Sequence, residues 1–246
     1  MHSKKLLISI VSHGQGSLIR KLLHDLNTHL INSEYNVNVV VTLNIPEEEQ
    51  FLSGFNNLSI KVIRNSIQKG FGENNNYAFY CFESDFFLVL NPDVRINVNL
   101  IDPMISSFSI NVGVMAPRVL SAAGTIEDSF RKFPTICNLI KRKLMSTREL
   151  DYFISELNLY EVDWVGGMFM LFHSPKYRNV NGFDEKYFMY LEDADICKRL
   201  LGIGFSVIYN PSYEIVHDAR RNSRIKVKYL LWHLRSMARF LFKNYI

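Results

Sequence analysis

Three carboxylates, Glu192, Asp193 and Asp195, open a segment with helical spacing, and His217 follows a short apolar strand further along the chain. Bulky apolar and aromatic side chains precede the acids. Such neighbours desolvate a carboxylate and raise its pKa toward the working range of a general base. Acids in a first helical turn are also ordinary partners of the helix dipole, and a lone histidine after an apolar run is often a core residue. Asp195 lies four residues before Arg199, which predicts a structural ion pair.

Two further segments carry polar groups where a ligand could bind. Asn91-Pro92-Asp93 follows the apolar run 86–90; a carboxylate there can hold Mg²⁺ or Mn²⁺ against a diphosphate, and the same tripeptide fits an Asx turn. Lys69–Asn76 is rich in glycine and asparagine, which suits either backbone contact with phosphate or ribose oxygens or a plain helix entry. Gly166-Gly167 inside a strand indicates close approach of another backbone or a substrate ring.

Alternating elements place these segments at one edge of a sheet. Apolar or alternating runs predict strands at 6–11, 37–43, 59–64 and 86–90, with helices at 17–30 and 74–82 between them. Strands separated by helices predict an α/β fold with a mostly parallel sheet. Ligands bind beyond the carboxyl ends of such strands. Ser12-His13, Asn44 and Asn91–Asp93 stand at those ends.

Composition restricts the class of protein. The chain has 246 residues, 48% hydrophobic and 13% aromatic, which supplies a core and excludes a disordered chain. Three cysteines without a CxxC pair indicate reduced thiols of a cytosolic protein and argue against a disulfide framework or a zinc site. The N-terminal apolar run is only about seven residues, and no run approaches the ~20 that span a bilayer. We expect one domain, soluble or peripheral to a membrane.

The C-terminal end is strongly basic. Residues 217–246 contain eight lysines and arginines and one acid, Asp218, although the whole chain has a net charge of +4. This asymmetry indicates an anionic partner, such as a phosphate, a nucleic acid or a lipid headgroup, or else a solvated basic helix. No recognised nucleic-acid-binding motif accompanies it, so we expect no nucleic-acid partner.

A final helix over residues 224–244 is predicted to be amphipathic. Val227, Leu230, Leu234, Met237 and Leu241 fall on one face, and Arg224, Lys228, Arg235, Arg239 and Lys243 fall on the opposite face together with Trp232. We expect the apolar face to pack on the domain. The basic face would then point outward, as suits an anionic membrane surface.

Taken in order, the segments ISIVSHG, NSIQKGFGENNN, FLVLNPDV, VDWVGGMFMLF and GFDEKYFMYLEDADICKRL, with Pro211–His217, resemble the family-2 glycosyltransferases. The resemblance is to the bacterial rhamnosyltransferase branch, which adds rhamnose to undecaprenyl-diphosphate-linked N-acetylglucosamine. It covers most of the chain except about 121–159. It implies a GT-A fold, a Rossmann-like mostly parallel sheet flanked by helices, with a C-terminal amphipathic basic helix. Residues 1–95 would form the nucleotide-binding half, 96–216 the acceptor-binding half and 217–246 the basic helix.

The resemblance also implies residue roles. Asp193 matches the general base, and Asp93 and His217 match the ligands of Mg²⁺ or Mn²⁺. Substrate contacts fall on Ser12, His13, Asn44, Gly70, Phe71, Asn75 and Asn91 for the nucleotide, on Trp164, Gly166, Gly167 and Glu192 for sugar and acceptor, and on Arg220, Arg221 and Arg224 for the diphosphate. Two positions depart from the family pattern: Asn91 replaces the first acid of the DxD motif, and Leu43 stands where many members have Asp.

The activity implied is inverting, metal-assisted transfer of L-rhamnose from dTDP-L-rhamnose to an undecaprenyl-diphosphate-linked sugar, with GlcNAc the expected acceptor sugar, in O-antigen or other cell-surface polysaccharide synthesis. It would take place in the cytoplasm, at the inner face of the membrane. Transfer of a hexose or galactofuranose by the same fold is one alternative. A non-catalytic protein that binds a sugar nucleotide or a membrane is the other.

Overall fold

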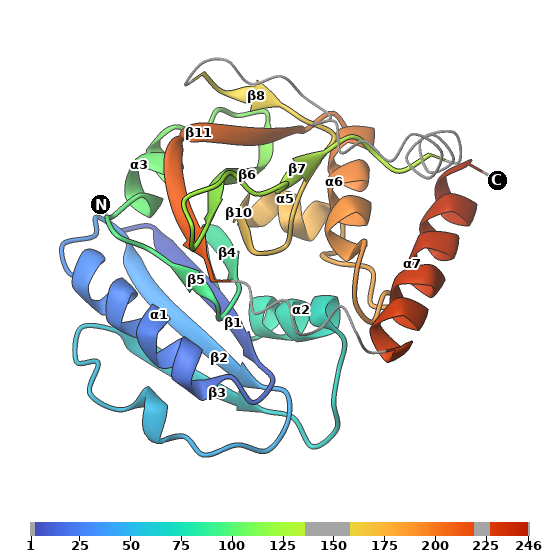
Figure 1. Ribbon diagram of the computed structural model, residues 1–246. Helices are drawn as coiled ribbons and strands as arrows, with labels where there is room; N and C mark the ends of the chain where they lie inside the picture. Colours follow the sequence, from blue (N-terminus) through green and yellow to red (C-terminus); the bar gives the residue numbers. More distant parts are fainter. Residues whose placement is uncertain (1–2, 136–157, 219–226, 246) are drawn as a thin grey trace.

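The computed structural model describes residues 3–135, 158–218 and 227–245. Within them one sheet has nine strands, in the order β3-β2-β1-β4-β10-β6-β11-β5, with β8 added beside β11 (Figure 1). The strands are β1 (Lys5–Ser12), β2 (Asn36–Leu43), β3 (Ser59–Arg64), β4 (Phe86–Leu90), β5 (Val94–Arg95), β6 (Val112–Ser121), β8 (Tyr160–Glu161), β10 (Phe169–His173) and β11 (Ser206–His217). A separate pair joins β7 (Phe130–Arg131) to β9 (Trp164–Val165).

The first half of the sheet is parallel, as the alternation of elements predicts. β1 pairs with β2 and β4, and β2 pairs with β3, all in parallel register. The helices between them are α1 (Gly16–His29) and α2 (Phe71–Cys81), with the short 3-10 helix η1 (Gln50–Leu52) after β2. α2 begins three residues before the predicted start, because the Phe71 N–H bonds to the Phe188 carbonyl at 2.9 Å and fixes the glycine-rich entry.

The second half mixes directions. β10 runs antiparallel to both β4 and β6, and β11 pairs parallel with β6 and antiparallel with β5. Its helices are α3 (Ile101–Ser106), α5 (Ser174–Asn179) and α6 (Glu192–Gly202). The reversed β10 lies between β4 and β6, so the turn that leads into β10 comes to the carboxyl end of β4.

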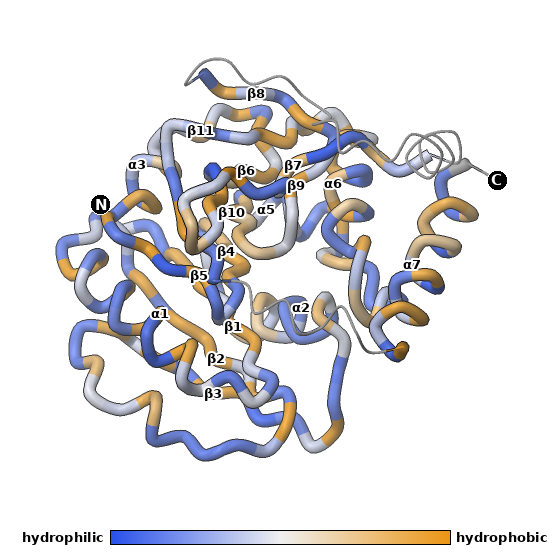
Figure 2. The backbone as a smooth tube through the Cα atoms, viewed as in Figure 1, coloured by the Kyte–Doolittle hydropathy of each residue, from blue (hydrophilic) through white to orange (hydrophobic). Residues whose placement is uncertain are grey.

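The core lies on both faces of the sheet. β1 and β2 are hydrophobic over most of their length (Figure 2), and all five residues of β4 are buried because strands flank β4 on both sides. α1 and α3 pack their apolar residues on one face of the sheet, whereas α2, α5 and α6 pack theirs on the other. Two covered faces explain why the strands of this chain read as continuous apolar runs.

α7 (Val227–Tyr245) contradicts the predicted orientation of the last helix. Val227 and Leu230 of the expected inner face are exposed, whereas Phe240 is fully buried. Arg239 and Lys243, expected to point outward, instead pair with carboxylates of the domain. The correction has an electrostatic reason: the partly exposed Asp184 and the buried Asp195 offer partners that helical periodicity alone cannot reveal. Among the described helices, none combines the length and apolarity that crossing a bilayer requires.

Gly72 sets the distance between α2 and the segment that leads to α6. A Cβ at this position would lie 2.7 Å from the Phe183 Cβ, which belongs to a buried side chain and is close to the backbone. We predict that Gly72→Ala lowers the free energy of unfolding by about 1–3 kcal/mol, because the contact forces the backbone to shift. Urea denaturation of the purified variant measures this change.

Gly202→Ala is the matched control, because a Cβ there meets nothing within 4 Å. It should leave stability unchanged or raise it by about 0.5–1 kcal/mol through helix propensity. Equal stability of Gly72→Ala and the wild-type protein would contradict the close approach of α2 to Phe183.

Candidate active site

The turn of residues 166–168, between β9 and β10, connects the two polar clusters predicted from the sequence. Its Gly167 N–H donates to Oδ2 of Asp193 at 3.0 Å. Its Met168 carbonyl accepts from the Asn91 N–H at 2.9 Å. A Cβ at Gly167 would lie 3.8 Å from the Asp193 oxygen, so the carboxylate approaches bare backbone. The turn therefore ties the carboxyl end of β4 to the start of α6.

The chain enters α6 through two residues in an unusual conformation. Tyr190 and Leu191 have φ angles of 72° and 64°, in the left-handed region that side-chain-bearing residues seldom adopt. Such residues persist when packing around them compensates a cost of about 1–3 kcal/mol each. Leu191 is buried, and the ring of Tyr190 contacts His233 of α7 edge-on at 5.4 Å between centroids. This entry places Glu192 and Asp193 in the first turn of α6.

Glu192 and Asp193 are adjacent carboxyls whose surroundings shift their pKa values. Burial raises the pKa of Asp193 to about 6. The N–H groups of Ala194 and Gly167 donate to its two oxygens at 2.8 and 3.0 Å, and the charge of Arg131 also favours its ionised form. Burial, and then the charge of Asp193, raise the pKa of Glu192 well above its usual value. Asp193, with a pKa of about 6, is ionised at neutral pH, whereas burial and the neighbouring charge favour the protonated form of Glu192, the direction of difference expected of a catalytic pair.

These two side chains also differ in access. Glu192 is buried, and its Oε2 has no hydrogen-bond partner among the described residues. Asp193 keeps part of its surface exposed. A buried oxygen without a partner is costly unless a ligand or water satisfies it. The pair thus offers the accessible Asp193 carboxylate as a base and, beside it, the Glu192 Oε2, whose hydrogen-bonding capacity is available to a ligand.

Asp195 has a structural role, as its spacing predicts. Its buried carboxylate pairs with Arg199 at 2.8 Å within α6 and with Lys243 of α7 at 2.6 Å. Both partners hold the charge inside the protein, where an unpaired carboxylate would be costly. Among the three acids at the start of α6, Asp195 is therefore the one that links α6 to α7 by an ion pair.

The two predicted metal ligands lie together. The His217 Nε2 is 3.3 Å from Oδ1 of Asp93, and the Asp218 N–H bonds to the Asp93 carbonyl at 2.9 Å, where β11 pairs with β5. The opposite ring nitrogen, Nδ1, is 2.8 Å from Oε2 of Glu127. Burial lowers the pKa of His217, but the two carboxylates outweigh it and raise the pKa to about 9. With this raised pKa, the protonated His217 ring donates one N–H to each of the two carboxylates.

The donor types and positions at Asp93 and His217 suit a divalent cation. A carboxylate oxygen and an imidazole nitrogen face each other, and both side chains keep some exposed surface. No group of three possible protein ligands converges among the described residues. The protein would supply two donors and leave the other positions to phosphate oxygens and water, as magnesium sites commonly do.

Glu127 was missed by the sequence prediction. It lies after β6, in a stretch whose mixture of charged residues and turns shows no periodicity. Glu127 accepts a hydrogen bond from Nδ1 of His217, which fixes the orientation of the ring and directs Nε2 toward Asp93. This arrangement is typical of carboxylate–histidine–metal sites. Only the fold brings Glu127 to His217, which is 90 positions away.

The predicted nucleotide contacts Ser12, Asn44 and Asn75 use their side chains within the protein. The Asn44 amide accepts from the Lys69 N–H at 2.8 Å and donates to the Lys69 carbonyl at 3.0 Å. Oδ1 of Asn75 accepts from the Ser9 hydroxyl at 2.8 Å, and Ser12 is fully buried. These groups shape the loops around the carboxyl ends of β1 and β2. Their contact with a nucleotide stays a prediction.

The other predicted contacts lie on more accessible segments. His13 is exposed just after β1. Gly70 comes so close to the segment before α6 that a Cβ would lie 2.9 Å from the Phe188 carbonyl oxygen, and Phe71 follows it as the first residue of α2. Asn91 is partly exposed beside the turn of residues 166–168. Arg220, Arg221 and Arg224 lie outside the described residues.

Trp164 packs against the buried cluster that includes Leu191 and Ala194, on either side of Asp193. It also contacts Arg131, which the sequence analysis did not identify. The Trp164 indole N–H donates to the Lys132 carbonyl at 3.1 Å, and the Arg131 guanidinium lies 5.8 Å from the centre of the Trp164 ring. Arg131 is opposite Trp164 in the β7–β9 pair, and the Gly166 N–H bonds to the backbone of the same segment. The pairing of two-residue strands 33 positions apart has no clear sequence signal.

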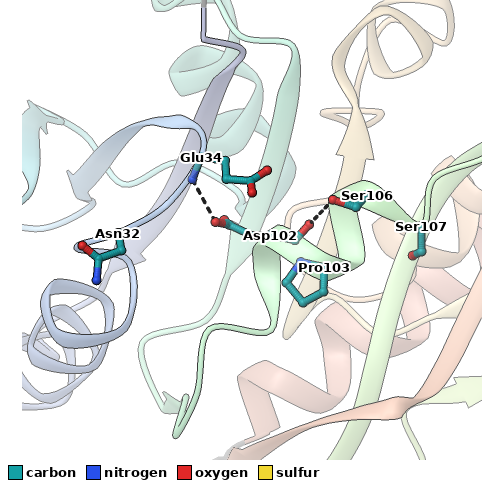
Figure 3. Close-up of a pocket in the computed structure, with 6 residues that line it drawn as sticks. All are labelled: Asn32, Glu34, Asp102, Pro103, Ser106 and Ser107. Carbon is teal, nitrogen blue, oxygen red and sulfur yellow. Dashed lines mark hydrogen bonds between the residues drawn. The ribbon is translucent and has the colours of Figure 1, made fainter.

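A surface depression elsewhere carries none of these groups. It is lined by Asn32, Glu34, Asp102, Pro103, Ser106 and Ser107, beside α3 (Figure 3). Asp102 points into it but accepts hydrogen bonds from the Ser33 hydroxyl at 2.8 Å and the Glu34 N–H at 3.1 Å. These bonds join α3 to the loop before β2, so the carboxylate in the depression has a structural role.

Comparisons with known proteins relate this chain to glycosyltransferases. A family model described as the N-terminal domain of galactosyltransferase matches residues 153–220, which include Asp193 and His217. The rhamnosyltransferase WbbL of Escherichia coli K12 is 31% identical over 97% of this chain and 93% of its own length. An N-acetylglucosaminyl-diphospho-decaprenol L-rhamnosyltransferase of Mycobacterium tuberculosis is 29% identical over 64% of this chain, and the match spans 55% of that protein.

A solved structure shows the same fold. The crystal structure of GalNAc-T7 with UDP, GalNAc and Mn²⁺ superposes with a TM-score of 0.73 over 98% of this chain and 48% of that chain, at 13% identity. The mixed sheet, the superposition on GalNAc-T7 and the match to WbbL over 93% of its length lead to one conclusion. The chain belongs to the rhamnosyltransferase branch of the family-2 glycosyltransferases, enzymes of the GT-A fold.

Proposed function

We propose that this enzyme transfers L-rhamnose from dTDP-L-rhamnose, with inversion, to a polyprenyl-diphosphate-linked sugar, of which GlcNAc is the best-supported choice. The carrying observation is the Asp193 carboxyl, with its pKa raised to about 6, held against the backbone of Gly167 and adjacent to the buried Glu192. The names of the two bacterial relatives support rhamnose and a lipid-diphosphate acceptor. The product would enter O-antigen or another cell-surface polysaccharide, made on the cytoplasmic face of the membrane.

Asp193 supplies the base for this reaction. One of its oxygens would accept the proton of the acceptor hydroxyl while the hydroxyl oxygen attacks the anomeric carbon from the side opposite the diphosphate. The N–H groups of Gly167 and Ala194 orient the carboxylate. Inversion follows because a single displacement forms the new glycosidic bond as the bond to the diphosphate breaks. Glu192, as the neutral neighbour, would donate a hydrogen bond to a sugar hydroxyl.

Asp93 and His217 would hold Mg²⁺ or Mn²⁺, which neutralises negative charge that develops on the departing diphosphate. GalNAc-T7, which shares the fold, contains Mn²⁺. In this division residues 1–95 bind the nucleotide and residues 96–216 bind the acceptor. The basic segment 217–246 would add charge near the diphosphate and the membrane. A hexose or galactofuranose donor is the alternative within the same chemistry.

The direct test is a donor panel. Purified protein is incubated with dTDP-rhamnose, UDP-hexoses or UDP-galactofuranose and a short-chain lipid-diphosphate GlcNAc, with Mg²⁺, with Mn²⁺ or with EDTA. We expect transfer from dTDP-rhamnose alone, and loss of transfer with EDTA. Transfer from another donor would overturn the assignment of rhamnose, and turnover that is unchanged in EDTA would overturn the metal-dependent mechanism.

Glu127 gives a separate prediction for the metal site. In Glu127→Gln the Nδ1 partner loses its charge, so Mn²⁺ should bind about 10–100-fold more weakly in calorimetry without substrates. Glu49→Gln is the matched control, because Glu49 pairs with Arg64 at the surface. Equal Mn²⁺ affinity of Glu127→Gln and the wild-type protein would exclude the orienting role.

The pH dependence of stability tests the same contact without metal. A histidine with a folded-state pKa near 9 stabilises the fold fully below its unfolded pKa, near 6.5, and this stabilisation is lost as the pH rises through 9. Metal-free wild-type protein should therefore lose up to about 3 kcal/mol of unfolding free energy over this window. Glu127→Gln should lose less, as measured by urea denaturation at several pH values. The same loss in both proteins would contradict the predicted coupling.

A further inference from the structure

The outer face of α7 carries an apolar stripe. Its large apolar side chains, which fall on one side of the helix at 3.6 residues per turn, are all more than half exposed: Val227 71%, Leu230 58%, Leu231 59%, Leu234 55% and Phe242 64%. With this spacing they form one continuous side of the helix. A contiguous apolar surface on a globular protein marks a site of interaction with a protein or a membrane.

The inner face of α7 packs against the rest of the domain. Phe240 is buried, and the Ser236 hydroxyl donates to the Met189 carbonyl at 2.8 Å. Trp232 packs on Phe188 with ring centroids 4.6 Å apart. Together with the ion pairs of Arg239 and Lys243, these contacts fix the rotation of the helix about its axis. The apolar stripe therefore faces away from the domain, at the edge of the molecule (Figure 1).

Charge around the stripe indicates what covers it. Lys228 and Arg235 are exposed on one flank of the stripe, and α7 contains no acidic residue. Arg239 and Lys243 are neutralised by Asp184 and Asp195 and so are not available outside. Lys228 is exposed although its Nζ lies 4.6 Å from the centre of the Trp232 ring. An apolar face bordered by exposed cations is typical of a helix that lies in the plane of an anionic lipid surface.

A second copy of the chain fits this face less well. In a two-fold dimer the same patch meets itself, and two α7 helices packed along their stripes would bring Lys228 and Arg235 of both copies together. Because α7 has no acid, the helices could not pair these charges with each other. Lipid phosphates supply the missing negative charge.

We propose that α7 docks on an anionic bilayer through this apolar stripe, with Lys228 and Arg235 at the headgroups. The opposite face of α7 holds residues 184–191, which lead directly into Glu192 and Asp193. Docking would therefore place the start of α6 next to the bilayer. The biological meaning rests on the proposed function, since a lipid-linked acceptor would present its diphosphate at the same surface.

Vesicle binding tests the proposal without any substrate. The full chain is sedimented with phosphatidylcholine vesicles, with or without phosphatidylglycerol. We expect binding that depends on the anionic lipid, at least about tenfold weaker in Leu230→Asp/Leu234→Asp. The matched control is Ile110→Asp, because Ile110 is an 86% exposed apolar residue outside α7. It should bind like the wild-type protein, and Lys228→Gln/Arg235→Gln should lose the preference for phosphatidylglycerol.

Failure of docking and failure of the proposed function are distinguishable. Vesicle binding is measured without donor or acceptor, so a wrong substrate assignment leaves it unchanged. Circular dichroism should show that the aspartate variant stays folded, and its transfer to a short-chain acceptor in solution should equal that of the wild-type protein. Equal vesicle binding by the wild-type protein and the variant would overturn the proposal. The proposal would also be overturned if the wild-type protein bound no vesicles and formed a dimer that is lost in the aspartate variant.

Discussion

The hydrogen bond from the Gly167 N–H to Asp193 is the contact on which the site depends. It joins the turn before β10, which also receives the Asn91 N–H, to the first turn of α6. Asp93, one of the metal candidates, and Asp193, the base, come from segments 100 positions apart in the chain. The reversed strand β10 brings them together because the turn that precedes it reaches the end of β4 and the start of α6 at once.

The same contact controls the chemistry of the carboxyl pair. Burial alone favours the neutral form of both acids, as it does for Glu192. Two backbone N–H groups favour the ionised form of Asp193 and keep its pKa near 6. A base with this pKa is ionised at neutral pH, and its pKa lies closer to the working pH than that of an exposed carboxylate. The difference between the two adjacent acids thus arises from the hydrogen bonds and the Arg131 charge at Asp193, and from the effect of the Asp193 charge on Glu192.

Local sequence patterns predict the parts of this enzyme that depend on local structure. The strands 59–64 and 86–90 match β3 and β4. The edge strand β3 is only partly buried and alternates, whereas the continuous burial of β4 leaves an unbroken apolar pattern. The Asp195–Arg199 pair follows from helical spacing. The placement of Asp193 and of the Asp93–His217 cluster came from resemblance to a family, because no spacing rule connects segments so far apart.

Other features could not be predicted because distant contacts decide them. Glu127 acts on a histidine 90 positions away, and Arg131 acts through a strand pair of only two residues. α7 shows the limit most clearly. Its amphipathic pattern is real, but Asp184 and Asp195 attract the basic side inward and leave the apolar stripe outside. Periodicity shows that a helix has two faces, and the tertiary partners decide which one is buried.

The central claim is that Asp193 is the base, and the pH dependence of kcat tests it most directly. With saturating dTDP-rhamnose and a short-chain lipid-diphosphate acceptor, kcat should fall below a pH near 6, as the Asp193 carboxylate becomes protonated. Asp193→Asn should keep the fold and lose at least about 100-fold in kcat, at every pH. Turnover by Asp193→Asn at the wild-type rate, with the same acidic limb, would contradict the account.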